Sequence, residues 1–258
     1  MLYAGVGVGI AITGIMVPVL ARVGGWSAGW LGLGAVSLLL VVATARLTSG
    51  GVPESAARRA GSQGGVPSEA AFRLWGITAA YGLEGLGYIV MATFITAFFR
   101  NLSTATWLGD VSWVMVGVAA VPSCWLWTAA ARTWGWRTAT YAAFAAQAAG
   151  VLLPAALQGA VPALAGSLLF GATFMGITTL SLSIGRQCAP ADSGRVIGRM
   201  TAMFGIGQVL GPLAAGSLTA ATHSYTLSMR LSGLLLLAAV GLLWLARGLP
   251  DRVGVGAG

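Results

Sequence analysis

The stretch from Leu74 to Phe99 reads LWGITAAYGLEGLGYIVMATFITAFF and lies between Arg73 and Arg100. It holds 26 residues, and Glu84 is the only charged one among them. The hydrocarbon core of a bilayer is about 30 Å thick, and about 20 apolar residues in an α-helix cross it. A continuous apolar run of this length therefore predicts a transmembrane helix.

The rest of the 258-residue chain repeats this pattern, and only 8% of its residues are charged, against about 25% in an ordinary soluble domain. The runs are rich in Leu, Ala and Gly, whereas the strands of a membrane barrel alternate apolar and polar residues. We predict an all-α polytopic membrane protein with about eight transmembrane helices in a lipid bilayer. The runs cover residues 2–20, 26–45, 74–99, 111–130, 138–157, 161–184, 200–220 and 227–246.

This composition excludes a water-soluble enzyme, a disordered tail and a disulfide scaffold. Cys124 and Cys188 form no metal-ligand pattern, and nothing resembles a nucleotide-binding loop or a nucleophile with its base. We therefore predict no catalytic residue, no metal and no cofactor. The net charge of +8 could suit nucleic acid, but the Arg residues are scattered between apolar runs. No nucleic-acid partner is predicted.

The 14 Arg residues orient the helices, because cytoplasmic loops of membrane proteins carry an excess of basic residues. Alternate connections hold 11 Arg on one side and 3 on the other, the three being Arg22, Arg100 and Arg230. We therefore predict an integral protein of the bacterial inner membrane with both termini in the cytoplasm.

The chain divides at a polar segment rich in Gly, Ser and Pro, which is typical of a linker. We expect residues 1–46 to be the last two helices of an N-terminal half, and residues 47–72 a cytoplasmic linker. Residues 73–248 would form a six-helix bundle, and residues 249–258 a cytoplasmic tail.

A repeated spacing supports this division, since Gly5, Gly14 and Pro18 match Gly198, Gly207 and the pair Gly211-Pro212 six spans later. Many secondary carriers consist of repeated halves. With a period of six helices, the first half would lack its opening four, so we expect an N-terminally truncated carrier. The alternative for residues 1–21 is a cleaved signal peptide, but a basic n-region and an A-x-A site are missing.

Three stretches carry a family resemblance: AYGLEGLGYIVMATF (80–94), GRMTAMFGIGQVLGPLAAG (198–216) and YAGVGVGIAITGIMVPVL (3–20). They resemble the major facilitator superfamily (MFS), in its YbfB/YjiJ-like branch. The resemblance covers nearly the whole chain, apart from the linker and the tail. It implies a helical transporter bundle in which the eight spans are helices five to twelve of the family's usual twelve.

One family motif is only partly present. The cytoplasmic motif Gly-x-x-x-Asp-Arg-x-Gly-Arg-Arg survives as ARTWGWR at 131–137. By resemblance, Arg132, Gly135 and Arg137 are candidates for a cytoplasmic gating loop. The motif's Asp is missing, which puts in doubt the charge relay by which such loops gate.

Glu84 is the main candidate site residue, because it lies about 16 Å along a helix from Arg73 and about 24 Å from Arg100. An ionised carboxylate near mid-bilayer costs about 2.5 kcal/mol or more. Glu84 must therefore be protonated, face a wet cavity, or meet a partner from the missing helices. Tyr81 and Tyr88 share its helical face, which suits a proton and an organic substrate. In the alternative, Glu84 is neutral and bonded to a neighbouring helix, with both tyrosines as packing.

Other polar and small residues are candidates for a pathway or for packing. Phe174 and Thr178 lie on one stripe of their helix and could line a substrate path, although helix packing is the favoured interpretation. Gln208 is a further pathway candidate, since an unsatisfied amide in lipid is costly. The matched positions Gly5, Gly14, Pro18, Gly198, Gly207, Gly211 and Pro212 are expected to serve helix packing and gating.

The predicted function is secondary active transport of a small organic solute by alternating access, with protons coupled through Glu84. The alternative is an inactive truncated fragment, or a non-transporting assembly subunit completed by a missing N-terminal half. An intramembrane enzyme is disfavoured, because it needs paired ionisable groups within the bilayer and only Glu84 is available.

Overall fold

The structure is a computed structural model that describes residues 4–47, 68–102, 107–157 and 159–246. Within these ranges the chain is almost entirely helical and contains no strand, which confirms the all-α class. Most of the predicted linker and the predicted tail lie outside the described residues. The helices are α1 (Ala4–Leu47), α2 (Ser68–Leu102), α3 (Trp107–Trp134), α4 (Trp136–Ala156), α5 (Ala160–Cys188), the short η2 (Pro190–Asp192), α6 (Ser193–Thr222) and α7 (Tyr225–Leu245).

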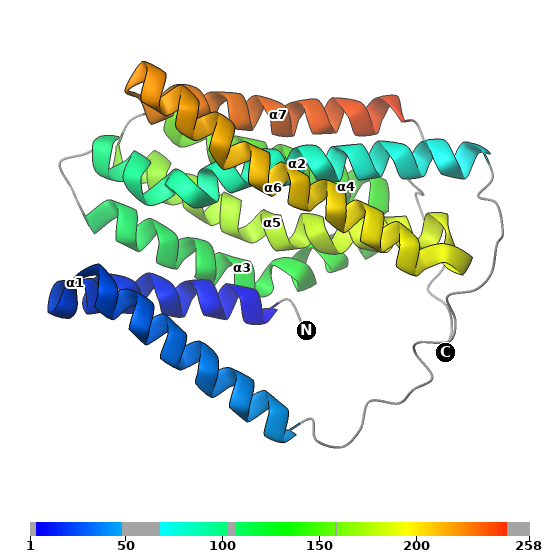
Figure 1. Cartoon of the computed structure of the whole chain (residues 1–258). Coiled ribbons are helices and arrows are strands. Elements are labelled where there is room, and N and C mark those ends of the chain that lie inside the picture. Colours follow the sequence, from blue (N-terminus) through cyan, green and yellow to red (C-terminus); the bar gives the residue numbers. More distant parts are fainter. Residues whose placement is uncertain (1–3, 48–67, 103–106, 158, 247–258) are drawn as a thin grey trace.

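Helix α1 consists of two arms that meet at Gly24 and Gly25. Gly25 has φ 69°, a value that glycine adopts without the steric cost a Cβ would bring, so the chain can turn back here. A straight helix of 44 residues would be about 66 Å long, more than twice the apolar thickness of a bilayer. Figure 1 shows the two arms diverging from this turn. They correspond to the first two predicted apolar runs, and α2 to α7 to the other six.

Helices α2 to α7 form a bundle whose long axes run in roughly the same direction (Figure 1). Helix α2 contacts α6 and α7, α4 contacts α5 and α7, and α3 contacts α5. The bundle has two ends. The hairpin end carries the α1 turn at Gly24–Gly25, the end of α2 and the start of α3, and the linker end carries the start of α2 (Figure 1).

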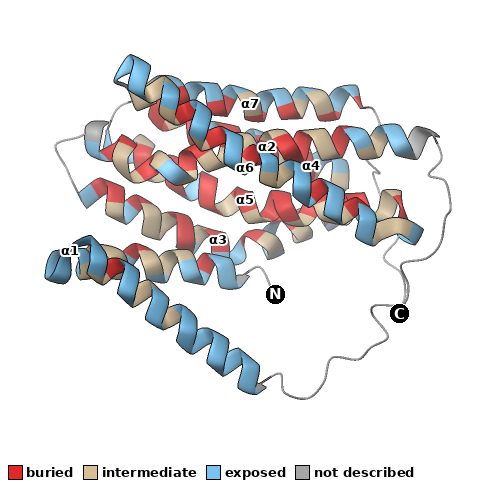
Figure 2. Ribbon diagram, in the orientation of Figure 1, coloured by how far each residue is buried: buried red, intermediate tan, exposed pale blue. Residues whose placement is uncertain are grey.

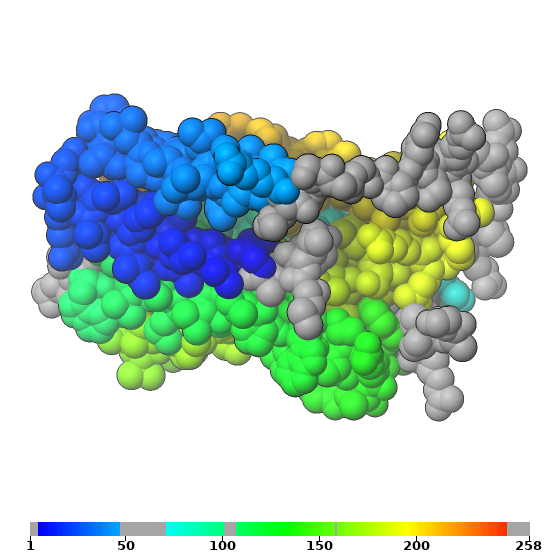
Figure 3. Space-filling model, turned by 90° about the horizontal axis from the view of Figure 1, so that it is seen from below, coloured from blue at the N-terminus to red at the C-terminus, as the bar shows by residue number. Residues whose placement is uncertain are grey.

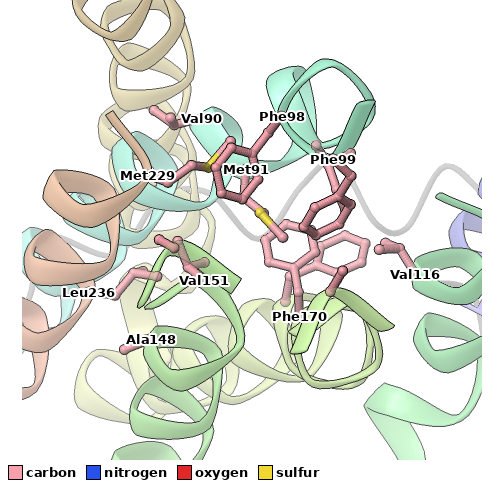
Figure 4. Packing of buried hydrophobic residues seen from close by; sticks show 14 of the residues in the cluster. Val90, Met91, Phe98, Phe99, Val116, Ala148, Val151, Phe170, Met229 and Leu236 are labelled. Carbon is pink, nitrogen blue, oxygen red and sulfur yellow. The ribbon is translucent and has the colours of Figure 1, made fainter. Parts of the chain in front are cut away.

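The apolar core of the bundle consists of two clusters. One, towards the linker end, includes Ile77, Phe144, Ile177 and Leu243. The other, towards the hairpin end, is drawn in Figure 4, where Phe99 and Phe170 lie near Val116, Phe98 lies beside Met91, and Val151 and Leu236 lie on the opposite side of the cluster from Val116. The described chain therefore has a packed interior of side chains along its whole length.

The outer surface is also apolar, as expected for a protein surrounded by lipid. Buried residues face the inside of the bundle and exposed residues face outward (Figure 2). Large apolar side chains are among the most exposed, for example Val23, Trp26 and Leu31 in α1 and Leu213 in α6. Seven helices of the described residues are long and apolar enough to cross a membrane, α1 being the folded one.

The two arms of α1 differ in their contacts. The first arm packs on α3, where a Cβ on Gly7 would lie 2.6 Å from the backbone nitrogen of Val121. The second arm, from Trp26 onward, is exposed along most of its length. Seen from below, both arms form one blue layer beside the green surface of the bundle (Figure 3).

Candidate functional site

Glu84 lies at the middle of α2, and only 1% of it is exposed. Glycines flank it at positions 82, 85 and 87 and let two other helices approach α2 closely. A Cβ on Gly85 would lie 3.0 Å from Cα of Phe204 in α6, and one on Gly87 would lie 3.0 Å from the carbonyl oxygen of Ser232 in α7. Small residues at such crossings are typical of membrane helix packing. The close contacts help to bury the Glu84 carboxyl group.

The carboxyl group of Glu84 has a single hydrogen-bond partner among the described residues. Gln147 of α4, itself 0% exposed, donates from Nε2 to Glu84 Oε1 at 3.2 Å. Oε2 of Glu84 and Oε1 of Gln147 are buried without a partner in this arrangement. The contact is of the kind expected if Glu84 is neutral and bonded to a neighbouring helix.

Five aromatic rings beside Glu84 come together from three helices, and we call them the aromatic cluster. Between ring centroids, Tyr81 is 4.6 Å from Phe204, while Tyr88 is 5.3 Å from Phe204 and 6.0 Å from Phe174. Phe170 lies 5.7 Å from Phe174, and the interplanar angles of these pairs do not exceed 16°. Such stacked pairs contribute about 0.5–1.5 kcal/mol each beyond their buried area. The cluster links α2, α5 and α6.

Polar groups at the edge of the cluster are hydrogen-bonded to one another. The Tyr81 hydroxyl donates to Thr178 Oγ1 at 3.5 Å, and the Thr178 hydroxyl donates to the carbonyl of Phe174 at 3.2 Å. Gln208 of α6 donates from Nε2 to the Tyr88 hydroxyl. The structure thus brings together the predicted site residues of three different helices: Tyr81 and Tyr88 of α2, Phe174 and Thr178 of α5, and Gln208 of α6.

Two members of the site, Phe204 and Phe170, were not predicted from the sequence. A third, Gln147, is a polar residue in an apolar helix, and this signal makes it a lesser pathway candidate beside Gln208. Phe204 lies one turn before Gln208 on the same face of α6. Phe170 has no sequence signal that separates it from ordinary core residues.

The predicted packing positions of α6 lie partly on its crossing with α2. A Cβ on Gly207 would lie 2.6 Å from the carbonyl oxygen of Gly82, and one on Gly211 would lie 2.6 Å from the carbonyl oxygen of Leu86. Pro212 follows inside α6. Gly198 is exposed, with no atom within 4 Å of a Cβ placed on it.

The matching positions of α1 show the same division. Gly14 is buried against α3, where an added Cβ would lie 3.0 Å from Cγ2 of Val114. Gly5 is exposed, and a Cβ there would have no atom within 4 Å. Pro18 lines a cavity of about 570 Å³ at the hairpin end. The repeated spacing therefore corresponds to helix contacts at Gly14 and Gly207 but not at Gly5 and Gly198.

The cavity at the hairpin end lies between α1, α2 and α3, away from the aromatic cluster. Its lining includes Thr13, Thr96 and Trp113, together with an ion pair in which Arg100 Nη2 lies 2.7 Å from Asp110 Oδ1. The side chains of this pair are 50% and 22% exposed. The Asp110 carboxylate is thus paired with a cation and partly exposed, whereas the Glu84 carboxyl group is buried and has an amide as its partner.

The candidate gating loop is a single residue between two helices. Gly135 separates α3 from α4 and has φ 88°, a backbone conformation that favours glycine. Arg132 and Arg137 on either side of it are exposed. The structure therefore places all three candidates at the linker end, and their gating role stays a prediction.

Fold and site together define a polytopic helical membrane protein with a buried carboxyl group beside stacked aromatic rings. Residues 1–244 match the family described as "Uncharacterised MFS-type transporter YbfB", so the chain belongs to this family of MFS-type transporters. This confirms the resemblance that the three sequence stretches indicate. No curated protein matches the chain.

Proposed function

We propose that the chain carries a small organic solute by alternating access, as a secondary active transporter in which Glu84 takes up and releases the coupled proton. Membership of the YbfB family supports transport across a membrane in general. The observation that carries the finer proposal is the burial of the Glu84 carboxyl group in the middle of α2, with an amide as its partner.

The surroundings of Glu84 favour its neutral form in this arrangement of the helices. An ionised carboxylate at this depth costs about 2.5 kcal/mol or more. The described Arg residues of the four helices that pack around this part of α2 lie near helix ends: Arg137 in α4, Arg186 in α5, Arg195 and Arg199 in α6, and Arg230 in α7. Ionisation of Glu84 would therefore require water or a cationic solute to reach it.

A proton on Glu84 would also improve the hydrogen bonding of the pair with Gln147. The ionised pair leaves two buried acceptor oxygens, Glu84 Oε2 and Gln147 Oε1, without a donor. A protonated carboxyl group supplies one donor, and the nearby amide oxygen can accept it. We infer that proton release is linked to a movement that separates this pair or wets it.

The aromatic cluster would connect this proton to a solute. Tyr88 lies one turn after Glu84 on α2 and stacks on rings from α5 and α6. A shift of α6 against α2 at the glycine crossing would change the cluster and the burial of Glu84 together. An acid beside aromatic rings favours a neutral or cationic solute.

The test uses proteoliposomes that contain a trapped pH-sensitive dye and receive a panel of small organic cations and neutral solutes. We expect Glu84→Gln to reduce solute-linked proton movement at least tenfold while exchange of labelled for unlabelled solute continues. Asp110→Asn is the matched control and should retain both activities. Proton-coupled uptake at the wild-type rate in Glu84→Gln would contradict the coupling role. Wild-type protein that exchanges none of these solutes would contradict transport of this class.

We also propose that the linker end faces the cytoplasm of a bacterial cell, with both termini on that side. Seven described Arg residues lie towards the linker end: Arg46, Arg73, Arg132, Arg137, Arg186, Arg195 and Arg199. Three lie towards the hairpin end, and the positive-inside rule assigns the richer end to the cytoplasm. A single Cys introduced at exposed Trp134, with Cys124 and Cys188 replaced, should react with a membrane-impermeant maleimide only after permeabilisation. Equal labelling of intact and permeabilised cells would mean that the linker end faces the outside and would contradict the proposed orientation.

A further inference from the structure

Helix α5 approaches α3 through two glycines that leave no room for side chains. A Cβ on Gly171 would lie 2.8 Å from Cα of Val116, and one on Gly176 would lie 2.6 Å from Cγ of Trp127. The segment of α5 between these glycines contains Phe174, and Thr178 lies two residues after Gly176. Helix α3 therefore contacts the same segment of α5 that contributes Phe174 to the aromatic cluster.

Side chains of α3 bind the backbone of this turn directly. The Ser123 hydroxyl donates to the carbonyl of Ala172 at 2.7 Å and accepts from the backbone N–H of Gly176 at 2.9 Å. Trp127 Nε1 donates to the same carbonyl at 2.7 Å. In a regular α-helix the N–H of residue 176 bonds to the carbonyl of residue 172. Ser123 thus contacts both ends of one helical hydrogen bond.

We propose that Ser123, assisted by Trp127, is a positioning residue that fixes the turn Ala172–Gly176 of α5 and thereby sets the place of Phe174 and Thr178 in the aromatic cluster. A side chain that enters the i→i−4 ladder is a known cause of local helix distortion. Ser123 is 0% exposed, so water does not replace its contacts. The link runs from the Ser123 hydroxyl through the α5 backbone to the Phe174 ring beside Tyr88.

The chain offers a matched control for this role. Ser112 lies on the same helix, is also 0% exposed, and its hydroxyl has no hydrogen-bond partner in the described structure. Ser112→Ala therefore removes a buried hydroxyl without removing a bond to α5. Trp127→Phe is a second variant, because it retains an aromatic ring and removes the donor to Ala172 together with part of the ring volume.

The experiment uses the full chain labelled with 3-fluorotyrosine and ¹⁹F NMR in lipid nanodiscs. The protein contains five Tyr residues, and each resonance is assigned with a Tyr→Phe variant. We expect Ser123→Ala and Trp127→Phe to shift or broaden the resonances of Tyr81 and Tyr88. The resonance of Tyr225, which packs on Phe94 outside the cluster, should stay unchanged. Ser123→Thr should restore the wild-type positions, since it restores the hydroxyl.

Amide hydrogen exchange in the same samples gives an independent readout. Loss of the Ser123 bond should speed exchange of the Gly176 amide by about tenfold, the factor that corresponds to a net hydrogen bond near the upper end of the usual range. If Ser123→Ala cannot be purified in folded form, Trp127→Phe decides. Unchanged Tyr81 and Tyr88 resonances in the folded variants, or an equal shift in Ser112→Ala, would overturn the proposal. Neither readout depends on transport or on Glu84.

Discussion

Glu84 in α2 and Asp110 in α3 are two acidic residues with opposite surroundings. Glu84 lies at the middle of the helix, is 1% exposed, and has an amide as its described partner. Asp110 of α3 lies at the hairpin end, where Arg100 at the end of α2 pairs with it at 2.7 Å. The carboxyl group of Glu84 is buried without a cationic partner, whereas the carboxylate of Asp110 is partly exposed and paired with the guanidinium of Arg100.

The difference shows that the depth of an acidic side chain in the bundle decides how much its charge costs or contributes to stability. A surface ion pair is typically worth about 0–1 kcal/mol, because water already stabilises both charges. A buried carboxyl group without a cation is costly to ionise, so its proton depends on the surrounding helices. If this comparison is correct, equivalent changes at the two positions must have unequal effects.

The largest effect is expected from reversal of the charge at Glu84. Glu84→Lys places an ammonium group in a site that offers it one amide and no described carboxylate, and a charge at mid-bilayer costs about 2.5–3.5 kcal/mol. We expect a strong loss of folded protein in the membrane fraction, measured by detergent extraction and size-exclusion chromatography. Asp110→Lys, the matched reversal at the hairpin end, should retain most of it. Equal yields of the two variants would contradict the comparison.

A smaller effect is expected from removal of the amide that contacts Glu84. Gln147→Leu leaves the buried carboxyl group without its donor, which costs about 1–3 kcal/mol of unfolding free energy. Unfolding of the purified protein by denaturant in detergent measures this loss. The double variant Glu84→Leu with Gln147→Leu replaces both partners and should recover most of the stability, since no polar group is then left unpaired. If the double variant is as unstable as Gln147→Leu, the loss of stability in Gln147→Leu does not come from the unpaired carboxyl group of Glu84.

The sequence was sufficient for the parts of this site that depend on a single helix. The depth of Glu84 follows from its spacing to Arg73 and Arg100, because the rise per residue of a helix is fixed. Tyr81 and Tyr88 share its face because residues three and four positions apart are neighbours on the surface of a helix. The turn at Gly24–Gly25 falls between two apolar runs, so both arms of α1 were predicted, and in the structure the backbone leaves the helical conformation at these two glycines.

The partners from other helices could not be predicted in the same way. Gln147 is 63 positions from Glu84 in the chain, and their contact depends on how α2 and α4 rotate against each other. Periodicity shows which residues of one helix share a face but not which face of another helix meets it. The glycine repeat shows the same limit, because Gly14 and Gly207 lie in helix contacts whereas Gly5 and Gly198 are exposed.

The smallest effect, and the sharpest test of the comparison, is expected at the ion pair itself. Asp110→Asn removes the charge but keeps the shape, and the side chain of Arg100 is half exposed, so water can solvate the guanidinium that remains. The unfolding free energy should fall by about 1 kcal/mol or less, and high salt should reduce this difference because it screens exposed charges. Denaturant unfolding at low and at high salt checks both statements. A loss as large as that of Gln147→Leu, with no dependence on salt, would mean that Asp110 acts as a buried group and that the two acids do not differ as proposed.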